Sequence, residues 1–114
     1  MFNIGVIMKI ITKKKEEKIL KEETYSLDYT LIKWLDRHIK AYYDCANKVI
    51  DMSYHKYKYN GNTYTLEQIV KRLIDITGML SNEDYYFGED GEKLIELKDE
   101  MYDLLKLVHF GLWW

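Results

Sequence analysis

Few residues in this sequence have the types and spacing that metal binding requires. Zinc sites need histidines, cysteines and carboxylates at fixed spacings, and no HExxH or HxH pattern joins the histidines, which are His38, His55 and His109. The acidic stretch that begins at Asn82 fails as a calcium loop, because Phe87 replaces its glycine and Lys93 its last glutamate. The sequence therefore predicts no metal ion and no other cofactor.

Nucleophilic and phosphate chemistry also lack the residues that they need. The one cysteine, Cys45, lies among apolar residues in a helical pattern, where thiols are usually inert. No serine occupies a G-x-S-x-G turn, and the glycines of Gly88–Gly91 enclose two carboxylates that would repel a phosphate. General acid–base catalysis by Asp36, His38 or Asp44 has no supporting motif. We therefore expect a protein that is not an enzyme.

Lysines and tyrosines suggest a different chemistry, the binding of nucleic acid. One group of lysines lies near the N-terminus, and another alternates with tyrosines that could stack on bases. Against this interpretation, the pI is about 5.9, whereas dedicated nucleic-acid-binding domains are usually strongly basic. The candidate residues for this alternative function are Lys13, Lys14, Lys15, Lys56 and Lys58.

Aromatic residues beside carboxylates suggest recognition of another protein. The stretch Ser81–Gly91 (SNEDYYFGEDG) predicts a polar loop, where aromatic side chains are hard to bury, and protein interfaces are enriched in such side chains. The chain ends in two tryptophans, which either dock on the core or contact a partner or a second copy. The candidate partner-binding residues are Glu83, Asp84, Tyr85, Tyr86, Phe87, Glu89, Asp90, Trp113 and Trp114.

The size and composition of the chain indicate how many domains it forms and in which compartment it functions. With 114 residues, of which 47% are hydrophobic and 32% charged, we expect one globular domain, 1–114. A single cysteine allows no internal disulfide, which favours the cytoplasm. The apolar stretch Phe2–Ile11 precedes its lysines, the reverse of a signal peptide, and is shorter than the about 20 residues that span a bilayer. We therefore expect a cytoplasmic protein without membrane contact.

Apolar spacing predicts three helices. The first runs from Leu27 to about Met52, the second follows Thr65, whose T-L-E-Q motif matches a capping box, and the third begins near Asp90 or Gly91. The chain has no proline that would interrupt them. The predicted inward residues are Leu31, Leu35, Ile39, Tyr42 or Tyr43, Ala46, Val49 and Ile50, then Leu66, Ile69, Val70, Leu73, Ile74, Thr77 and Leu80, and then Leu94, Leu97, Met101, Leu104 or Leu105, and Val108.

Two further segments predict a small antiparallel sheet. Asn3–Thr12 is apolar and β-branched, which is typical of a strand, and the lysine-rich Lys13–Lys18 predicts a turn. The segment Ile19–Ser26 that follows fits either a second strand or a short helix. Asn60 and Gly61 predict the turn of a hairpin over Tyr54–Thr65, since both tolerate positive φ. The predicted fold class is therefore α+β, mostly helical, with three helices and a sheet that combines the N-terminal strand with this hairpin.

The hairpin turn also fixes which residues pair. Tyr59 would lie opposite Asn62, and Tyr57 opposite Tyr64. Because side chains alternate between the faces of a strand, the tyrosines of the first strand would point away from its lysines.

In character the sequence resembles the small accessory proteins of phages and mobile elements, including the anti-CRISPR inhibitors. The resemblance rests on the short length, the Lys-, Tyr- and Asn-rich composition, the stretch NEDYYFGEDGE and the end HFGLWW. Such inhibitors share no motif, so no residue roles carry over. The resemblance implies a phage-encoded inhibitor in the bacterial cytoplasm that blocks a host nucleic-acid-handling defence complex, such as a CRISPR effector.

The expected function is thus that of a non-enzymatic inhibitor whose partner is a host protein or ribonucleoprotein complex. One alternative is the small nucleic-acid-binding module. The other is a homo-oligomer that sequesters a nucleotide-like ligand between subunits lined by tyrosine and tryptophan.

Overall fold

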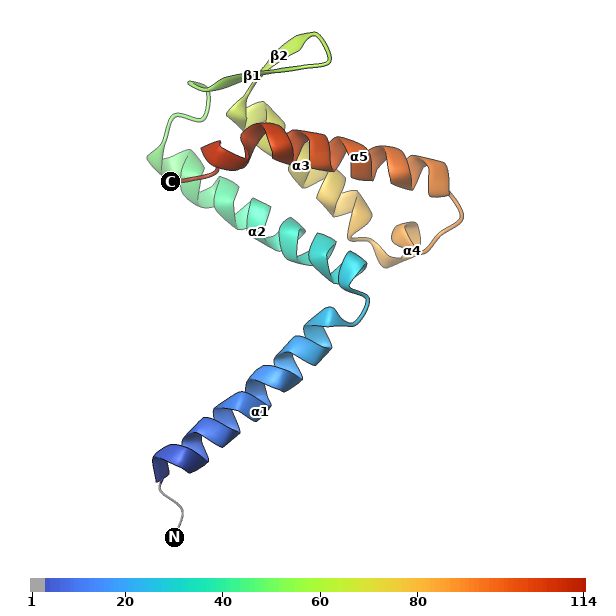
Figure 1. Cartoon of the computed structure of the whole chain (residues 1–114). Helices are drawn as coiled ribbons and strands as arrows, with labels where there is room; N and C mark the ends of the chain where they lie inside the picture. Colours follow the sequence, from blue (N-terminus) through green and yellow to red (C-terminus); the bar gives the residue numbers. More distant parts are fainter. Residues whose placement is uncertain (1–3) are drawn as a thin grey trace. The chain divides into compact units, whose positions relative to one another are not determined.

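The computed structural model describes residues 4–114, with side chains from Thr12 onward (Figure 1). The chain divides into two compact units, of which the first ends at Leu31 and the second is Ile32–Trp114. Along the described range the elements are α1 (Ile4–Thr24), α2 (Leu27–Val49), β1 (Lys56–Tyr59), β2 (Asn62–Thr65), α3 (Leu66–Leu80), α4 (Glu83–Tyr86), α5 (Gly91–Val108) and the 3₁₀ helix η1 (His109–Gly111). The prediction of a mostly helical chain with a small antiparallel sheet is confirmed.

Two details of the predicted fold class are wrong. The described residues form five α-helices rather than three. α4 was not expected, and α1 covers the predicted strand and turn as well as the segment from Ile19, for which a short helix was one of two alternatives. The sheet in this range has two strands, β1 and β2, so no N-terminal strand joins it. None of the described helices is both long enough and apolar enough to cross a membrane.

The first unit contains α1 where a strand and a turn were predicted. The strand prediction is wrong from Ile4 onward, while Asn3 lies outside the described residues, and the predicted turn at Lys13–Lys18 lies within the helix. Lysine and glutamate are good helix formers, and this stretch has no glycine, asparagine or proline that would favour a turn. Lys18 and Glu22 form an i,i+4 pair at 4.0 Å, a contact that supports a helix.

The face of α2 that turns to the core is shifted from the predicted one. The buried residues are Ile32, Asp36, Ile39 and Ala46. Two predicted inward residues are instead exposed, Leu31 by 47% and Val49 by 62%. Apolar residues occur on more than one side of this helix, so the spacing alone does not identify the buried side.

One apolar core organises the second unit. It combines residues of α2 with the buried faces of α3 and α5, which contact each other directly (Figure 1). The predicted faces of α3 and α5 are largely confirmed, although Ile76 is buried where Ile74 was expected. The fully buried side chains include Leu66, Val70, Leu73, Ile76, Leu80 and Val108.

The hairpin and the start of α3 follow the sequence pattern closely. Asn60 and Gly61 have φ values of 48° and 79°, as the predicted turn requires. The register pairs Tyr59 with Asn62 and Tyr57 with Tyr64, as predicted. The Thr65 hydroxyl accepts from the Gln68 amide at 3.2 Å and the Gln68 side chain accepts from the Thr65 amide at 2.9 Å, so the capping box is confirmed.

Candidate functional site

The acidic aromatic stretch between α3 and α5 contains a helical turn. The prediction of a loop over Ser81–Gly91 is wrong for Glu83–Tyr86, which form α4. Asn82 begins this helix, since its Oδ1 accepts from the Tyr85 amide at 3.1 Å. The first turn carries two carboxylates, where the helix dipole favours negative charge.

A tight connection leads from α4 to α5. Phe87 is the C-terminal cap of α4. A Cβ atom at the following Gly88 would lie 2.7 Å from the backbone oxygen of Asp84, so a larger residue requires a backbone shift. Asp90 then caps α5, with its Oδ1 accepting from the Lys93 amide at 3.3 Å. Caps on both sides thus fix the position of Phe87 relative to the two helices.

The exposed residues of this connection form one negatively charged surface, which we name the acidic tip. It consists of Glu83, Asp84, Phe87, Glu89 and Asp90. The Phe87 side chain is 60% exposed. The chain has no lysine or arginine between Arg72 and Lys93, and the basic residue that shares a surface hollow with Asp84 is Lys40 of α2.

The two tyrosines of the stretch are placed differently from Phe87. Tyr85 and Tyr86 are partly buried and pack against the core of the second unit. The Tyr86 and Phe87 rings meet edge to face, with centroids 4.9 Å apart and planes at 81°. Of the three candidate aromatic residues in this stretch, Phe87 is therefore the one that exposes most of its surface.

Replacing Tyr85 by phenylalanine should not weaken the fold. The Tyr85 hydroxyl is buried and has no hydrogen-bond partner among the described residues, so its removal should raise the free energy of unfolding by up to about 1 kcal/mol. Tyr43→Phe is the matched control, since the Tyr43 hydroxyl donates to Glu67 at 3.2 Å and its loss should cost about 0.5–1.5 kcal/mol. Urea unfolding measures both, and a larger loss for Tyr85→Phe would contradict this assignment.

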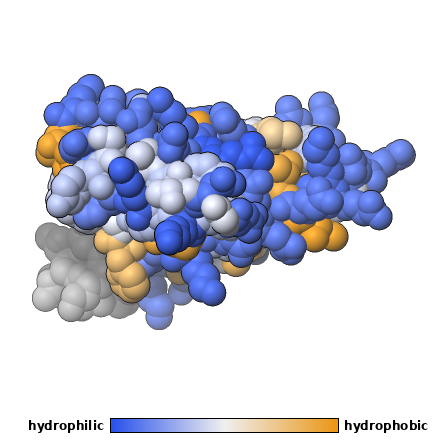
Figure 2. All heavy atoms as spheres, turned by 90° about the horizontal axis from the view of Figure 1, so that it is seen from above, coloured by the Kyte–Doolittle hydropathy of each residue, from blue (hydrophilic) through white to orange (hydrophobic). Residues whose placement is uncertain are grey.

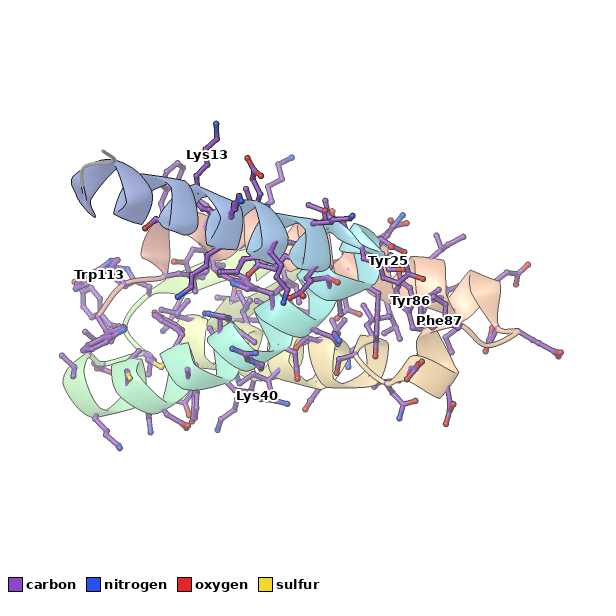
Figure 3. All side chains as sticks on the ribbon, turned by 90° about the horizontal axis from the view of Figure 1, so that it is seen from below. Lys13, Tyr25, Lys40, Tyr86, Phe87 and Trp113 are labelled. Atoms are coloured by element: carbon purple, nitrogen blue, oxygen red, sulfur yellow. The ribbon has the colours of Figure 1, made fainter. Side chains whose placement is uncertain are left out.

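The two C-terminal tryptophans lie far from the acidic tip. The Trp113 side chain is 57% exposed and that of Trp114 is 62% exposed. The Tyr42 hydroxyl donates a hydrogen bond to the Trp113 backbone oxygen at 3.2 Å and so holds the backbone at this residue. The 18 residues of α5 span about 27 Å at a rise of 1.5 Å per residue. Figure 3 accordingly labels Phe87 and Trp113 toward opposite ends of the second unit. The predicted partner-binding residues therefore form two surfaces rather than one.

The hairpin lysines of the alternative nucleic-acid site lie on the opposite face of β1 from its tyrosines. Lys56 and Lys58 are exposed, whereas Tyr57 and Tyr59 of the same strand are half-buried and pack against the core. The face that carries the lysines thus lacks the tyrosines of this strand as stacking platforms. The remaining candidate lysines, Lys13–Lys15, are exposed on α1 in the first unit.

The histidines contact aromatic neighbours. The His38 and Trp34 rings stack with centroids 4.0 Å apart, and His38 Nδ1 lies 2.6 Å from the Trp34 backbone oxygen. His55 meets Tyr54 edge to face. Among the side chains that the structure describes, no group of three histidine, cysteine or carboxylate residues could hold a metal ion.

Asp36, whose carboxylate could in principle act as a general acid or base, has structural partners. Its side chain is buried on α2, where Oδ1 accepts from the Thr77 hydroxyl at 3.0 Å and Oδ2 accepts from Lys40 at 2.9 Å. His38 and Asp44 on the same helix are exposed. Asp36 therefore joins α2 to α3.

The residues that shape the acidic tip, Asn82 and Gly88, were not among the predicted site residues. A signal for the first of them was present, since an asparagine followed by two acidic residues is typical of a helix start. The need for glycine at the second depends on a backbone oxygen in the preceding turn, which no residue pattern records.

Comparison with known proteins gives no further identification. The sequence matches no family model, and neither a curated protein nor a solved structure is significantly similar to it. Function must therefore be inferred from the geometry and charge of the surfaces themselves.

Proposed function

We propose that this chain is a non-enzymatic binding protein that attaches to a positively charged surface of another protein through the acidic tip. The observation that carries the proposal is Phe87, a 60% exposed aromatic ring held at the end of α4 among four exposed carboxylates. A rigidly placed aromatic residue can act as a hot spot, and complementary charge directs the encounter with the partner.

The surrounding surface favours a polar rather than a broadly apolar contact. In the view of Figure 2 the surface is mainly hydrophilic, and its hydrophobic residues lie in separate patches. A partner of opposite charge suits such a surface better than one that needs a large apolar area.

The class of partner that we propose is an enzyme that handles nucleic acid. Such enzymes present basic grooves to the phosphate backbone, and an acidic surface can occupy a groove of this kind. The resemblance to phage accessory proteins points the same way. The proposed function is thus inhibition of a host defence complex, such as a CRISPR effector, in the bacterial cytoplasm.

The test measures binding to purified CRISPR effector nucleases and inhibition of their cleavage. Phe87→Ala should weaken binding to the inhibited nuclease by about tenfold or more, as for an interface hot spot. The matched control is Phe110→Ala, which removes a 95% exposed phenylalanine at the other end of α5. Equal effects of the two substitutions would contradict the proposal that the acidic tip is the binding surface. A failure to inhibit any of the nucleases would contradict the proposed class of partner.

Charge reversal provides a second arm of the same experiment. Glu83→Lys with Glu89→Lys removes negative charge from the acidic tip without changing a helix cap. Glu96→Lys with Asp99→Lys makes the same change in net charge on exposed positions of α5. The first pair should slow association and the second should leave it nearly unchanged.

A further inference from the structure

A pocket lies beside the hairpin, at the end of α3 and α5 remote from the acidic tip. It has a volume of about 380 Å³, at the lower end of the roughly 300–1,000 Å³ that small-molecule sites occupy. We name it the hairpin pocket. Its lining includes Tyr59, Tyr64, Ile69, Arg72, Glu100 and Leu104.

Two aromatic rings and an apolar base shape the hairpin pocket. Tyr59 and Tyr64 are diagonal neighbours on one face of the hairpin, because Tyr59 pairs with Asn62. Both rings are half-buried. Ile69 and Leu104, from α3 and α5, are buried side chains of the core. The pocket thus combines two tyrosine rings with an apolar base, the residue types of an aromatic cage.

The charges beside these rings are predominantly negative. Arg72 donates to Glu100 through Nε at 2.5 Å and through Nη2 at 2.9 Å, so its positive charge is paired within the protein. Asp103 adds a second carboxylate, which accepts from the Tyr59 hydroxyl at 3.5 Å. Burial and the nearby negative charges of Asp103 and Glu100 raise the pKa of Tyr59 above its ordinary value. An anionic ligand would have to displace Glu100 from Arg72 and approach Asp103.

We propose that the hairpin pocket binds an organic cation, either a free alkylammonium compound or the basic side chain of a protein. Two tyrosine rings attract a cation through their π faces, and Asp103, the carboxylate that Arg72 does not pair with, supplies the opposite charge. The size of the pocket suits a group such as choline or the end of a lysine side chain. This site is independent of the acidic tip and of the function proposed for it.

The first experiment compares choline with its neutral carbon isostere, by following backbone amide NMR shifts of the full chain during titration. Choline should bind about tenfold tighter than the isostere and shift the Tyr59 and Tyr64 amides. Equal affinity of the two compounds would overturn the proposal, because the pocket would then recognise shape and not charge. Tighter binding of adenosine monophosphate than of choline would also overturn it.

A matched pair of substitutions locates the site. Asp103→Asn, which removes the carboxylate that contacts the Tyr59 hydroxyl, should weaken choline binding about threefold to tenfold. Asp99→Asn, the same change one turn earlier on α5 at a carboxylate that pairs with Lys98, should not. Tyr59→Leu should abolish binding and Tyr59→Phe should retain it, because cation–π attraction needs the ring and not the hydroxyl. If all four variants bind choline equally, the hairpin pocket is not the site.

The source of the cation is distinguished by a peptide. A short peptide with one trimethyl-lysine is compared with the same peptide containing norleucine, its uncharged analogue. Stronger binding of the trimethyl-lysine peptide than of choline indicates a protein side chain as the ligand, and the reverse indicates a small molecule. Failure of both cations to bind at millimolar concentration refutes the proposal.

Discussion

Replacing Ile32 by alanine should lower the free energy of unfolding by about 2–5 kcal/mol, the range for removing a large aliphatic side chain from a core. Ile32 is 5% exposed and belongs to the apolar cluster of the second unit. The substitution removes buried apolar contacts and leaves a cavity that the neighbouring helices fill only in part. Alanine has a higher helix propensity than isoleucine, which reduces the net loss only slightly.

The neighbouring residue provides the control. Leu31 is 47% exposed, so Leu31→Ala should change the free energy of unfolding by less than about 1 kcal/mol. Urea unfolding followed by circular dichroism measures both variants. A cost for Leu31→Ala equal to that for Ile32→Ala would show that Leu31 faces the core, as its spacing with Leu35 and Ile39 predicts.

Gly88→Ala should lower the free energy of unfolding by about 1–3 kcal/mol, the usual cost of inserting an atom into occupied space. The added Cβ would lie 2.7 Å from the Asp84 backbone oxygen and 3.3 Å from that of Tyr85. Both oxygens belong to the backbone of α4, which cannot rotate away as a side chain does. The substitution should therefore also move Phe87 and reduce binding through the acidic tip.

A second glycine in the same connection tests whether this effect is local. At Gly91, the first residue of α5, no heavy atom beyond its chain neighbours and the backbone of its own helical turn lies within 4 Å of an added Cβ. Gly91→Ala should therefore be neutral or slightly stabilising, since alanine is the better helix former. Comparable destabilisation by both substitutions would mean that general stiffening of the connection, and not a clash at Gly88, is responsible.

The parts of the fold that the sequence predicts best are those decided within a few residues. The turn at Asn60 and Gly61 and the capping box at Thr65 depend on backbone angles and hydrogen bonds between near neighbours. Residue types alone carry that information, and the structure agrees with them in position and in register.

The N-terminal segment shows why other parts could not be predicted as well. Its β-branched residues favour a strand, but a strand needs a partner to satisfy its backbone, whereas a helix satisfies its own. The chain that follows supplies lysine and glutamate without a turn residue, so α1 continues to Thr24. An N-terminal strand would have needed to pair with the hairpin, whereas the described sheet consists of β1 and β2.

The acidic tip was predicted in composition but not in geometry. The sequence places carboxylates and aromatic rings together, which identified the stretch. It does not show that Tyr85 and Tyr86 turn toward the core while Phe87 stays exposed, because that division follows from the direction of α4. The hairpin pocket depends on even more distant contacts, since Arg72 and Glu100 are 28 positions apart.

The positions of the tryptophans affect how this molecule can be observed. Trp34, Trp113 and Trp114 are 55%, 57% and 62% exposed, and the chain has only these three. An indole that already contacts water in the native state gains less hydration on denaturation than a buried one, so its fluorescence emission shifts less. A collisional quencher such as acrylamide should therefore reach all three rings in the native state.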